Sequence, residues 1–260
     1  MADAVVEVVR AAAFEGLPHG FLGRRGGVST GVAAGLNVGL GAGDDGSAVA
    51  ENRALAVAAV LPGGRLVTVY QVHSPDCVTV TAPWPDAERP HADALVTNRP
   101  GILLGIVTAD CAPVLLADVE AGVIGAAHAG WKGAIGGVTD AAITAMEALG
   151  AQRSRIAAAI GPCIAQGSYE VDDAFRARFC ADALDNARFF APGKPGHCHF
   201  DLAAYVAARL ATAGIARVER LELDTCALAD RYFSYRRATL LGQPAYGRQF
   251  SLIGLPERAS

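Results

Sequence analysis

The chain has 260 residues, of which 52% are hydrophobic and 18% charged, and its formal net charge is −4. A chain of this length buries roughly three quarters of its unfolded surface, which is typical of a globular protein and excludes a disordered one. No uncharged apolar run reaches the roughly 18 residues that a membrane-spanning helix needs. The first residues lack the basic charge that is typical of a leader peptide. The chain also has no run of basic residues of the kind that binds nucleic acid. We therefore expect a cytoplasmic protein that binds neither membranes nor nucleic acid.

The first helix is expected after a glycine-rich, irregular segment at residues 16–46. Ser47 is a suitable N-cap, apolar residues continue to Val60, and Pro62 ends the helix. Beyond it, runs of β-branched and apolar residues are typical of strands. These predicted strands lie at residues 66–72, 77–81, 94–97, 102–107, 114–117 and 123–127.

Helices and strands alternate in the second half of the chain. Helices are expected at residues 139–149 and 202–213, each followed by glycine, with strands at 155–160 and 217–223. The mixture predicts an α/β (α+β) fold, namely a single-domain sandwich of mixed β-sheet with flanking helices that spans residues 1–260.

Two glycine patterns are rejected as functional motifs. The GxGxxG pattern at residues 41–46 has no convincing strand before it and includes two aspartates where a pyrophosphate would need bare backbone N–H groups. The GxSxG pattern at residues 27–31 follows two arginines and not a buried strand. The six cysteines form no CxxC pair, so a zinc knuckle and a thioredoxin motif are also excluded.

Three potential metal ligands each follow a predicted strand: His73, Cys111 and His128. One thiolate and two imidazoles suit catalytic zinc, which usually has three protein ligands and keeps a fourth position open. Each residue taken alone also fits a structural role, and Cys111 with His128 as base would also suit a cysteine hydrolase. Asp110 could orient a ligand, bind a substrate hydroxyl or cap a turn. Spacing does not separate these alternatives.

The sequence resembles the YfiH and laccase-domain family in many blocks that occur in one order between about residues 21 and 255. The blocks are RRGGVSTGVAAGLNVGL from Arg24, ENR from Glu51, QVHS from Gln71, ADALVTN from Ala92, TADCAPVLL from Thr108, GAAHAGWKG from Gly125, IGPC from Ile160, SYEV from Ser168 and SYRR from Ser234. The resemblance implies an α/β sandwich with mixed sheets, in which His73, Cys111 and His128 bind zinc and carry the catalysis.

The activities that the resemblance implies disagree with one another. Members are described as purine nucleoside phosphorylases, adenosine deaminases and methylthioadenosine phosphorylases, as copper-dependent polyphenol oxidases (laccases), and as editors of peptidoglycan precursors, for which Cys111 would be the nucleophile. The residues favour a zinc-dependent purine nucleoside phosphorylase, because a multicopper oxidase requires several more histidine ligands. The HxH step at residues 197–199 keeps copper open as the alternative metal, but beside Pro195 and Gly196 a surface loop is expected.

Substrate-binding residues are sought among side chains that suit phosphate or a nucleoside. The candidates are Arg24, Arg53, Arg236 and Arg248 for phosphate and Asn37, Gln71 and Asp110 for the ribose or base. Trp131 could stack on a purine or belong to the core. Arg25 and Arg237 are interpreted as structural or surface charges, and Lys132 is left out because arginine is expected in that block. The expected partners are small molecules, in a monomer or small homo-oligomer.

Overall fold

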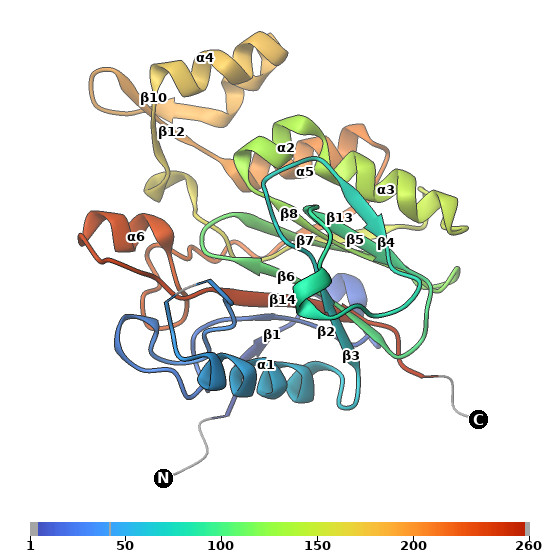
Figure 1. The fold of residues 1–260 in the computed structure, drawn as a ribbon. Helices are drawn as coiled ribbons and strands as arrows, with labels where there is room; N and C mark the ends of the chain where they lie inside the picture. The colour runs from blue at the N-terminus through green and yellow to red at the C-terminus, as the bar shows by residue number, and fades with distance from the viewer. Residues whose placement is uncertain (1–4, 42, 258–260) are drawn as a thin grey trace.

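The structure is a computed structural model that describes residues 5–41 and 43–257. Two mixed β-sheets pack face to face at its centre, and helices cover their outer faces (Figure 1). Among the helices of the described segments, none combines the length and apolar character that a membrane crossing requires.

Five strands form one sheet and six form the other. In spatial order the five-stranded sheet contains β1 (Val8–Val9), β2 (His19–Leu22), β14 (Gln249–Gly254), β6 (Ile102–Thr108) and β3 (Arg65–Thr68). The six-stranded sheet contains β13 (Arg217–Arg220), β9 (Ala157–Ile160), β7 (Ala112–Asp118), β8 (Val123–Ala129), β5 (Ala94–Thr97) and β4 (Cys77–Thr79). Only the pairs β3–β6, β13–β9 and β4–β5 are parallel.

Alternating side chains of β7 show why the layers stack. Leu115 and Ala117 belong to the core between the two sheets, whereas Val114 and Leu116 belong to the core under the helices. Successive side chains of a strand point to opposite faces, so an apolar run such as residues 114–117 needs cover on both sides.

Helices supply that cover. On the six-stranded sheet lie α2 (Trp131–Gly136), α3 (Val138–Ala148) and α5 (Leu202–Thr212), and on the five-stranded sheet lies α1 (Gly46–Val60). The layer order helix, sheet, sheet, helix confirms the predicted sandwich of mixed sheets with flanking helices.

The start of α1 corrects one expectation. Asp45, not Ser47, is the N-cap, and its carboxylate accepts a hydrogen bond of 2.9 Å from the Ser47 backbone N–H. Ser47 lies inside the first turn and its hydroxyl donates to the same carboxylate. The aspartate cap satisfies an N–H group that the helix itself leaves free.

Several strands were not expected from the sequence. The segment predicted as irregular contains β2 and a short 3₁₀ helix, η2 (Gly31–Ala33), and β14 occupies the middle of the five-stranded sheet. Conversely, the strand predicted at residues 66–72 ends at Thr68, because the chain turns away into the loop that carries His73. Glycines inside β2 and at the end of β14 weaken the strand pattern of both segments.

A small lobe projects beside α2 (Figure 1). It consists of η4 (Gln166–Ser168), β10 (Glu170–Asp172), α4 (Asp173–Asp182), η5 (Leu184–Phe189), β11 (Phe190–Pro192) and β12 (His197–Phe200). The surface loop expected at residues 197–199 is therefore wrong: the segment is strand β12, with Cys198 buried and its two histidines half-buried. Pro195 and Gly196 only make the turn that precedes it.

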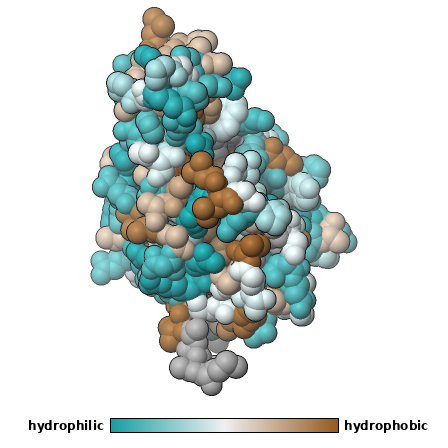
Figure 2. Space-filling model, turned by 90° about the vertical axis from the view of Figure 1, so that its left-hand side faces the viewer, coloured by the Kyte–Doolittle hydropathy of each residue, from teal (hydrophilic) through white to brown (hydrophobic). Residues whose placement is uncertain are grey.

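The remaining elements are short. They are the 3₁₀ helices η1 (Ala12–Phe14) and η3 (Asp86–Glu88) and the helix α6 (Tyr235–Leu240). Figure 2 shows the face that carries α6 and the lobe: hydrophilic and neutral residues cover most of it, and apolar residues form several separate groups. Most of the candidate ligand-binding side chains lie instead around two cavities at the edge of the sandwich.

Candidate metal centre and its two pockets

His73, Cys111 and His128 meet at the edge of the sandwich. Cys111 lies in the tight loop between β6 of one sheet and β7 of the other, His128 is near the end of β8, and His73 lies in the loop between β3 and β4. Their ligand atoms all lie within 4.8 Å of one another, and Cys111 Sγ is 3.9 Å from His73 Nε2. We call these three residues the trio. Their elements come from both sheets, so folding of the sandwich assembles the site.

The backbone at the trio is locally strained. His73 has φ +62° and Asp110, next to Cys111, has φ +87°. Left-handed conformations are costly for residues with a Cβ and cluster at functional sites. Gly130 leaves the space that the trio needs, because a Cβ there would lie 2.9 Å from Cys111 Sγ and 3.0 Å from His73 Cδ2.

Asp93 connects two members of the trio and was not expected from the sequence. Its fully buried carboxylate is 2.7 Å from His128 Nδ1, and it accepts hydrogen bonds from the Val72 and Ser74 backbone N–H groups at 3.0 and 2.7 Å. The first contact leaves His128 Nε2 for a metal, and the other two fix the backbone on both sides of His73. A single aspartate at the start of a strand carries no sequence signal for this role.

Electrostatics favour a thiolate at Cys111. Burial opposes ionisation, but the charges and hydrogen bonds of His128 and His73 outweigh it and lower the pKa of the thiol to about 6. Burial likewise opposes the charged form of His128, but Cys111 and Asp93 raise the pKa of its imidazole to about 9. The thiolate is the form of cysteine that binds metals.

The trio fits a metal ion. On a tetrahedral zinc ion, the bond lengths place sulfur and nitrogen ligands roughly 3.5 Å apart, so only small side-chain shifts are needed. Within the described residues it is the one group of three or more His, Cys, Asp or Glu side chains whose ligand atoms come this close. Three protein ligands leave a fourth position open, which is typical of catalytic sites.

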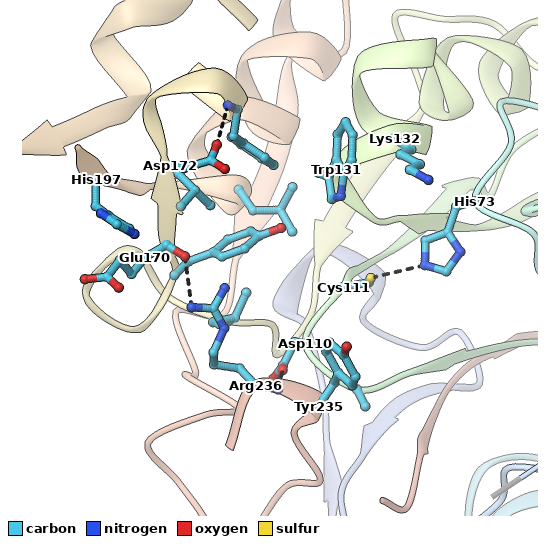
Figure 3. A pocket seen from close by; sticks show the side chains of 16 residues that line it. His73, Asp110, Cys111, Trp131, Lys132, Glu170, Asp172, His197, Tyr235 and Arg236 are labelled. Atoms are coloured by element: carbon cyan, nitrogen blue, oxygen red, sulfur yellow. Dashed lines mark hydrogen bonds between the residues drawn. The ribbon is translucent and has the colours of Figure 1, made fainter. Parts of the chain in front are cut away.

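The first of two cavities that open onto the trio is lined by aromatic side chains (Figure 3). This aromatic pocket has a volume of about 620 Å³, and its wall includes Trp131, Tyr169, Phe175 and Tyr235 besides His73 and Cys111. The sequence offers two roles for Trp131, stacking on a ligand or packing in the core. In the structure its side chain lines the pocket and also packs on Phe175, with ring centroids 5.1 Å apart.

Charged side chains complete the aromatic pocket. Arg236 donates to the Glu170 carbonyl oxygen at 2.9 Å and lies over the Tyr169 ring at 5.5 Å. Lys132 also lines this pocket, although on sequence grounds we leave it outside the site. Its ammonium group is 5.5 Å from the centroid of the Trp131 ring. The pocket therefore combines aromatic faces with cationic groups and with the acidic residues Asp110, Glu170 and Asp172.

The second cavity is lined by arginines. This arginine pocket has a volume of about 400 Å³, shares His73, Ala109 and Cys111 with the aromatic pocket, and also borders His128. Arg53, Arg89 and Arg248 line it. Two of these three arginines are among the phosphate candidates of the sequence, whereas Arg89 lies in a Pro- and Glu-containing loop and was missed.

Two further candidate substrate residues, Gln71 and Asn37, already form hydrogen bonds within the protein. Gln71 lines the arginine pocket, but its side-chain amide exchanges two hydrogen bonds of 2.8 Å with the Val107 backbone. Asn37 is fully buried and bonds to Asp44 and to the Gly39 and Arg248 backbone N–H groups.

Arg24 lies away from the trio. Its guanidinium donates to the Ala34 and Ala229 carbonyl oxygens, and it borders a separate small cavity. Arg25 pairs with Asp230 on the surface, and Arg237 donates to the backbone carbonyls of Thr225, Cys226 and Tyr232. These placements agree with the structural interpretation of Arg25 and Arg237.

Asp110 borders the aromatic pocket, but its carboxylate points into a hydrogen-bond network. It accepts from the Thr225 hydroxyl at 2.7 Å, the Ser234 hydroxyl at 2.9 Å and the Arg236 backbone N–H at 2.6 Å. The loop that bears Cys111 is thereby connected to the segment that bears Arg236.

Comparisons with known proteins place the chain among similar sequences and structures. The family described as multi-copper polyphenol oxidoreductase laccase matches residues 18–256. A Deinococcus radiodurans protein named purine nucleoside phosphorylase is 43% identical over 245 residues, which cover 93% of this chain and 90% of the relative. A Streptomyces griseus protein of the same name is 42% identical over 240 residues, covering 91% of this chain and 96% of the relative.

Solved structures show the same architecture. A Neisseria meningitidis protein of the DUF152 family has a TM-score of 0.85 with 31% identity, covering 97% of this chain and 99% of that one. YlmD from Geobacillus stearothermophilus has a TM-score of 0.85 with 28% identity, covering 98% of this chain and 100% of that one.

Proposed function

This chain belongs to the multi-copper polyphenol oxidoreductase laccase family, and because relatives that are 43% and 42% identical to it are named purine nucleoside phosphorylase, we propose that it is a zinc-dependent purine nucleoside phosphorylase. The observation that carries the proposal is the trio at the wall between an aromatic and an arginine-lined cavity. A purine can stack on aromatic rings and phosphate can bind arginine, and the trio, which would hold the metal, lies where the two cavities meet.

Zinc suits the trio better than copper. A blue-copper site also uses two histidines and a cysteine, but it adds a weak axial ligand that is usually methionine. Among the described residues no methionine lines either pocket, and Met146 is buried in the core between α3 and the six-stranded sheet. When bound, zinc would supply Lewis acidity toward the departing base or toward water.

The chain's own residues bind and orient the substrate. Trp131 and Tyr169 offer faces to the purine, and Asp93 keeps His128 and the loop of His73 in place. Phosphorolysis by dihydrogen phosphate exchanges the C1′–N9 bond of the nucleoside for a C1′–O bond and leaves the phosphate proton on the purine. The apolar side chains that line the aromatic pocket also suit methylthioadenosine, whose 5′ substituent is apolar. Attack of water at C6 of adenosine would instead exchange the C6–N bond for a C6–O bond and release ammonia, which is deamination.

Chromatography of adenosine and inosine incubated with metal-analysed protein tests the proposal. We expect adenine and hypoxanthine that depend on phosphate, inosine from adenosine without phosphate, and loss of all products together with zinc in Cys111→Ala. No product from zinc-loaded protein would contradict it. Oxygen uptake with phenols after copper loading would instead support a polyphenol oxidase. Hydrolysis of a peptidoglycan precursor that needs no metal and stops on alkylation of Cys111 would support the editing hydrolase.

A further inference from the structure

The arginine pocket carries positive charge that the protein does not neutralise. Among the described residues that line it, three are arginines and none is Asp or Glu. Arg53 and Arg89 share one carboxylate, that of Asp86, at 3.2 and 3.7 Å, and Arg248 forms no ion pair within the described chain. Three guanidinium groups against one carboxylate leave an excess of positive charge in the arginine set, which the single negative charge of the Cys111 thiolate in the same wall does not cancel.

Contacts within the protein hold Arg53 and Arg248 in place. The side chain of Arg53 is only 11% exposed, its guanidinium lies 5.0 Å from the Phe250 ring centroid, and it donates to the Val38 carbonyl oxygen at 3.3 Å. The stem of Arg248 packs on Gly39, where a Cβ would lie 3.2 Å from three of its carbons. A buried cation is costly unless a partner compensates it, so a fixed and partly unpaired set favours an anionic ligand.

A second observation points to the same cavity. Thr108 lines the arginine pocket, is only 2% exposed, and its hydroxyl has no hydrogen-bond partner. Buried polar groups are almost always paired, so an unpaired hydroxyl in a cavity wall is a sign of a missing ligand. A phosphate oxygen would accept a hydrogen bond from the Thr108 hydroxyl.

We infer that the arginine pocket binds inorganic phosphate through Arg53, Arg89, Arg248 and the Thr108 hydroxyl, and presents it to the trio as the attacking group. This inference rests on the proposed function and deepens it. The nucleoside and phosphate then enter through different cavities, which meet at Cys111 and His73. Each substrate can bind without displacing the other.

Phosphate affinity tests the inference directly, by calorimetric titration of the zinc-loaded protein with inorganic phosphate. We expect Arg248→Ala to weaken phosphate binding by roughly tenfold or more and to leave the zinc content unchanged. Thr108→Val keeps the shape of the side chain, so we expect phosphate binding to weaken by about three- to tenfold while the Tm stays constant or rises. Arg231→Ala removes a half-buried arginine that lines neither pocket, so it is the matched control and should leave phosphate affinity unchanged, whereas Arg236→Ala tests the aromatic pocket as the alternative site.

Adenosine 5′-monophosphate is the second probe, because a nucleotide could supply the same chemistry. If the nucleotide binds through Arg248 and inorganic phosphate does not bind, the inference is wrong. It is also wrong if all variants bind phosphate like the parent protein or if Arg236→Ala alone loses binding. Phosphate bound through Arg248 without nucleoside turnover would instead contradict the proposed function and leave the phosphate site standing.

Discussion

At the residue scale, the carboxylate of Asp93 is the shared support of two candidate metal ligands. We expect Asp93→Asn to weaken zinc binding by about 10- to 100-fold, because the amide cannot accept from His128 and from two backbone N–H groups at once. Asp118→Asn is the matched control, since Asp118 is also fully buried and also accepts from backbone N–H groups, but far from the trio. Competition with a chromophoric chelator measures both affinities, and equal values would exclude this role of Asp93.

The lowered pKa of Cys111 predicts selective alkylation of the metal-free protein. A thiol whose pKa is about 6 is mostly thiolate above pH 6 and loses reactivity as the pH falls through 6. Burial raises the pKa of Cys77 and Cys163 to about 12, so these two should stay unmodified at neutral pH. Mass spectrometry after iodoacetamide pulses between pH 5 and pH 9 checks the expected midpoint, and added zinc should protect Cys111. A midpoint near 9 would contradict the proximity of the imidazoles.

Some residues of the candidate site can be predicted from the sequence alone, and others cannot. His73, Cys111 and His128 could be selected because each is a strong ligand at the end of an apolar run. Asp93 and Arg89 could not, because their roles depend on contacts with distant segments. Asn37 and Gln71 have amide groups that suit a ligand as well as they suit the protein, and only the structure reveals their bonds within the chain.

At the element scale, the aromatic interior of the lobe supports one wall of the aromatic pocket. Phe179 of α4 is fully buried, and its ring centroid lies 5.0 Å from that of Phe175 and 4.6 Å from that of Phe200. We expect Phe179→Ala to cost about 3–5 kcal/mol of folding free energy and to raise the KM for nucleosides. Chemical denaturation and steady-state kinetics measure the two effects.

A second substitution in the lobe distinguishes loss of aromatic packing from the effect of any substitution in the lobe. Leu184, at the start of η5, is 85% exposed, so Leu184→Ala should change stability by less than about 0.5 kcal/mol and leave the KM unchanged. A similar loss of folding free energy in both variants would show that any substitution in the lobe is destabilising and that the aromatic core has no special role.

Elements with clear patterns and end signals were predictable, whereas β14 and the strands of the lobe were not. The run at residues 102–107 and the helix at 202–213 combine β-branched or amphipathic character with clear end signals. β12 escaped prediction because Pro195 and Gly196 suggest a loop, whereas burial of Cys198 and Phe200 against the aromatic cluster makes the segment a strand. Tertiary packing here overrides the local signal.

At the scale of the whole molecule, the trio joins segments from both sheets, so a bound metal should stabilise the entire fold. A ligand that binds only the folded state at 100 times its Kd adds about 2.7 kcal/mol. We expect chelation to lower the Tm by several degrees and zinc to restore it. Cys111→Ala should have a Tm that responds to neither reagent, and calorimetric scans with and without chelator measure this. A zinc response that survives in Cys111→Ala would place the metal elsewhere.

The position of β14 has a consequence for how the protein is made. β14 pairs with β2, far earlier in the chain, on one side and with β6 on the other. During synthesis the ribosome therefore releases all three trio residues long before the five-stranded sheet can close, and Arg248 of the arginine pocket emerges only just before β14. Until residue 254 emerges, the edges of β2 and β6 that β14 will cover stay unpaired, and unpaired strand edges are prone to pair with other chains.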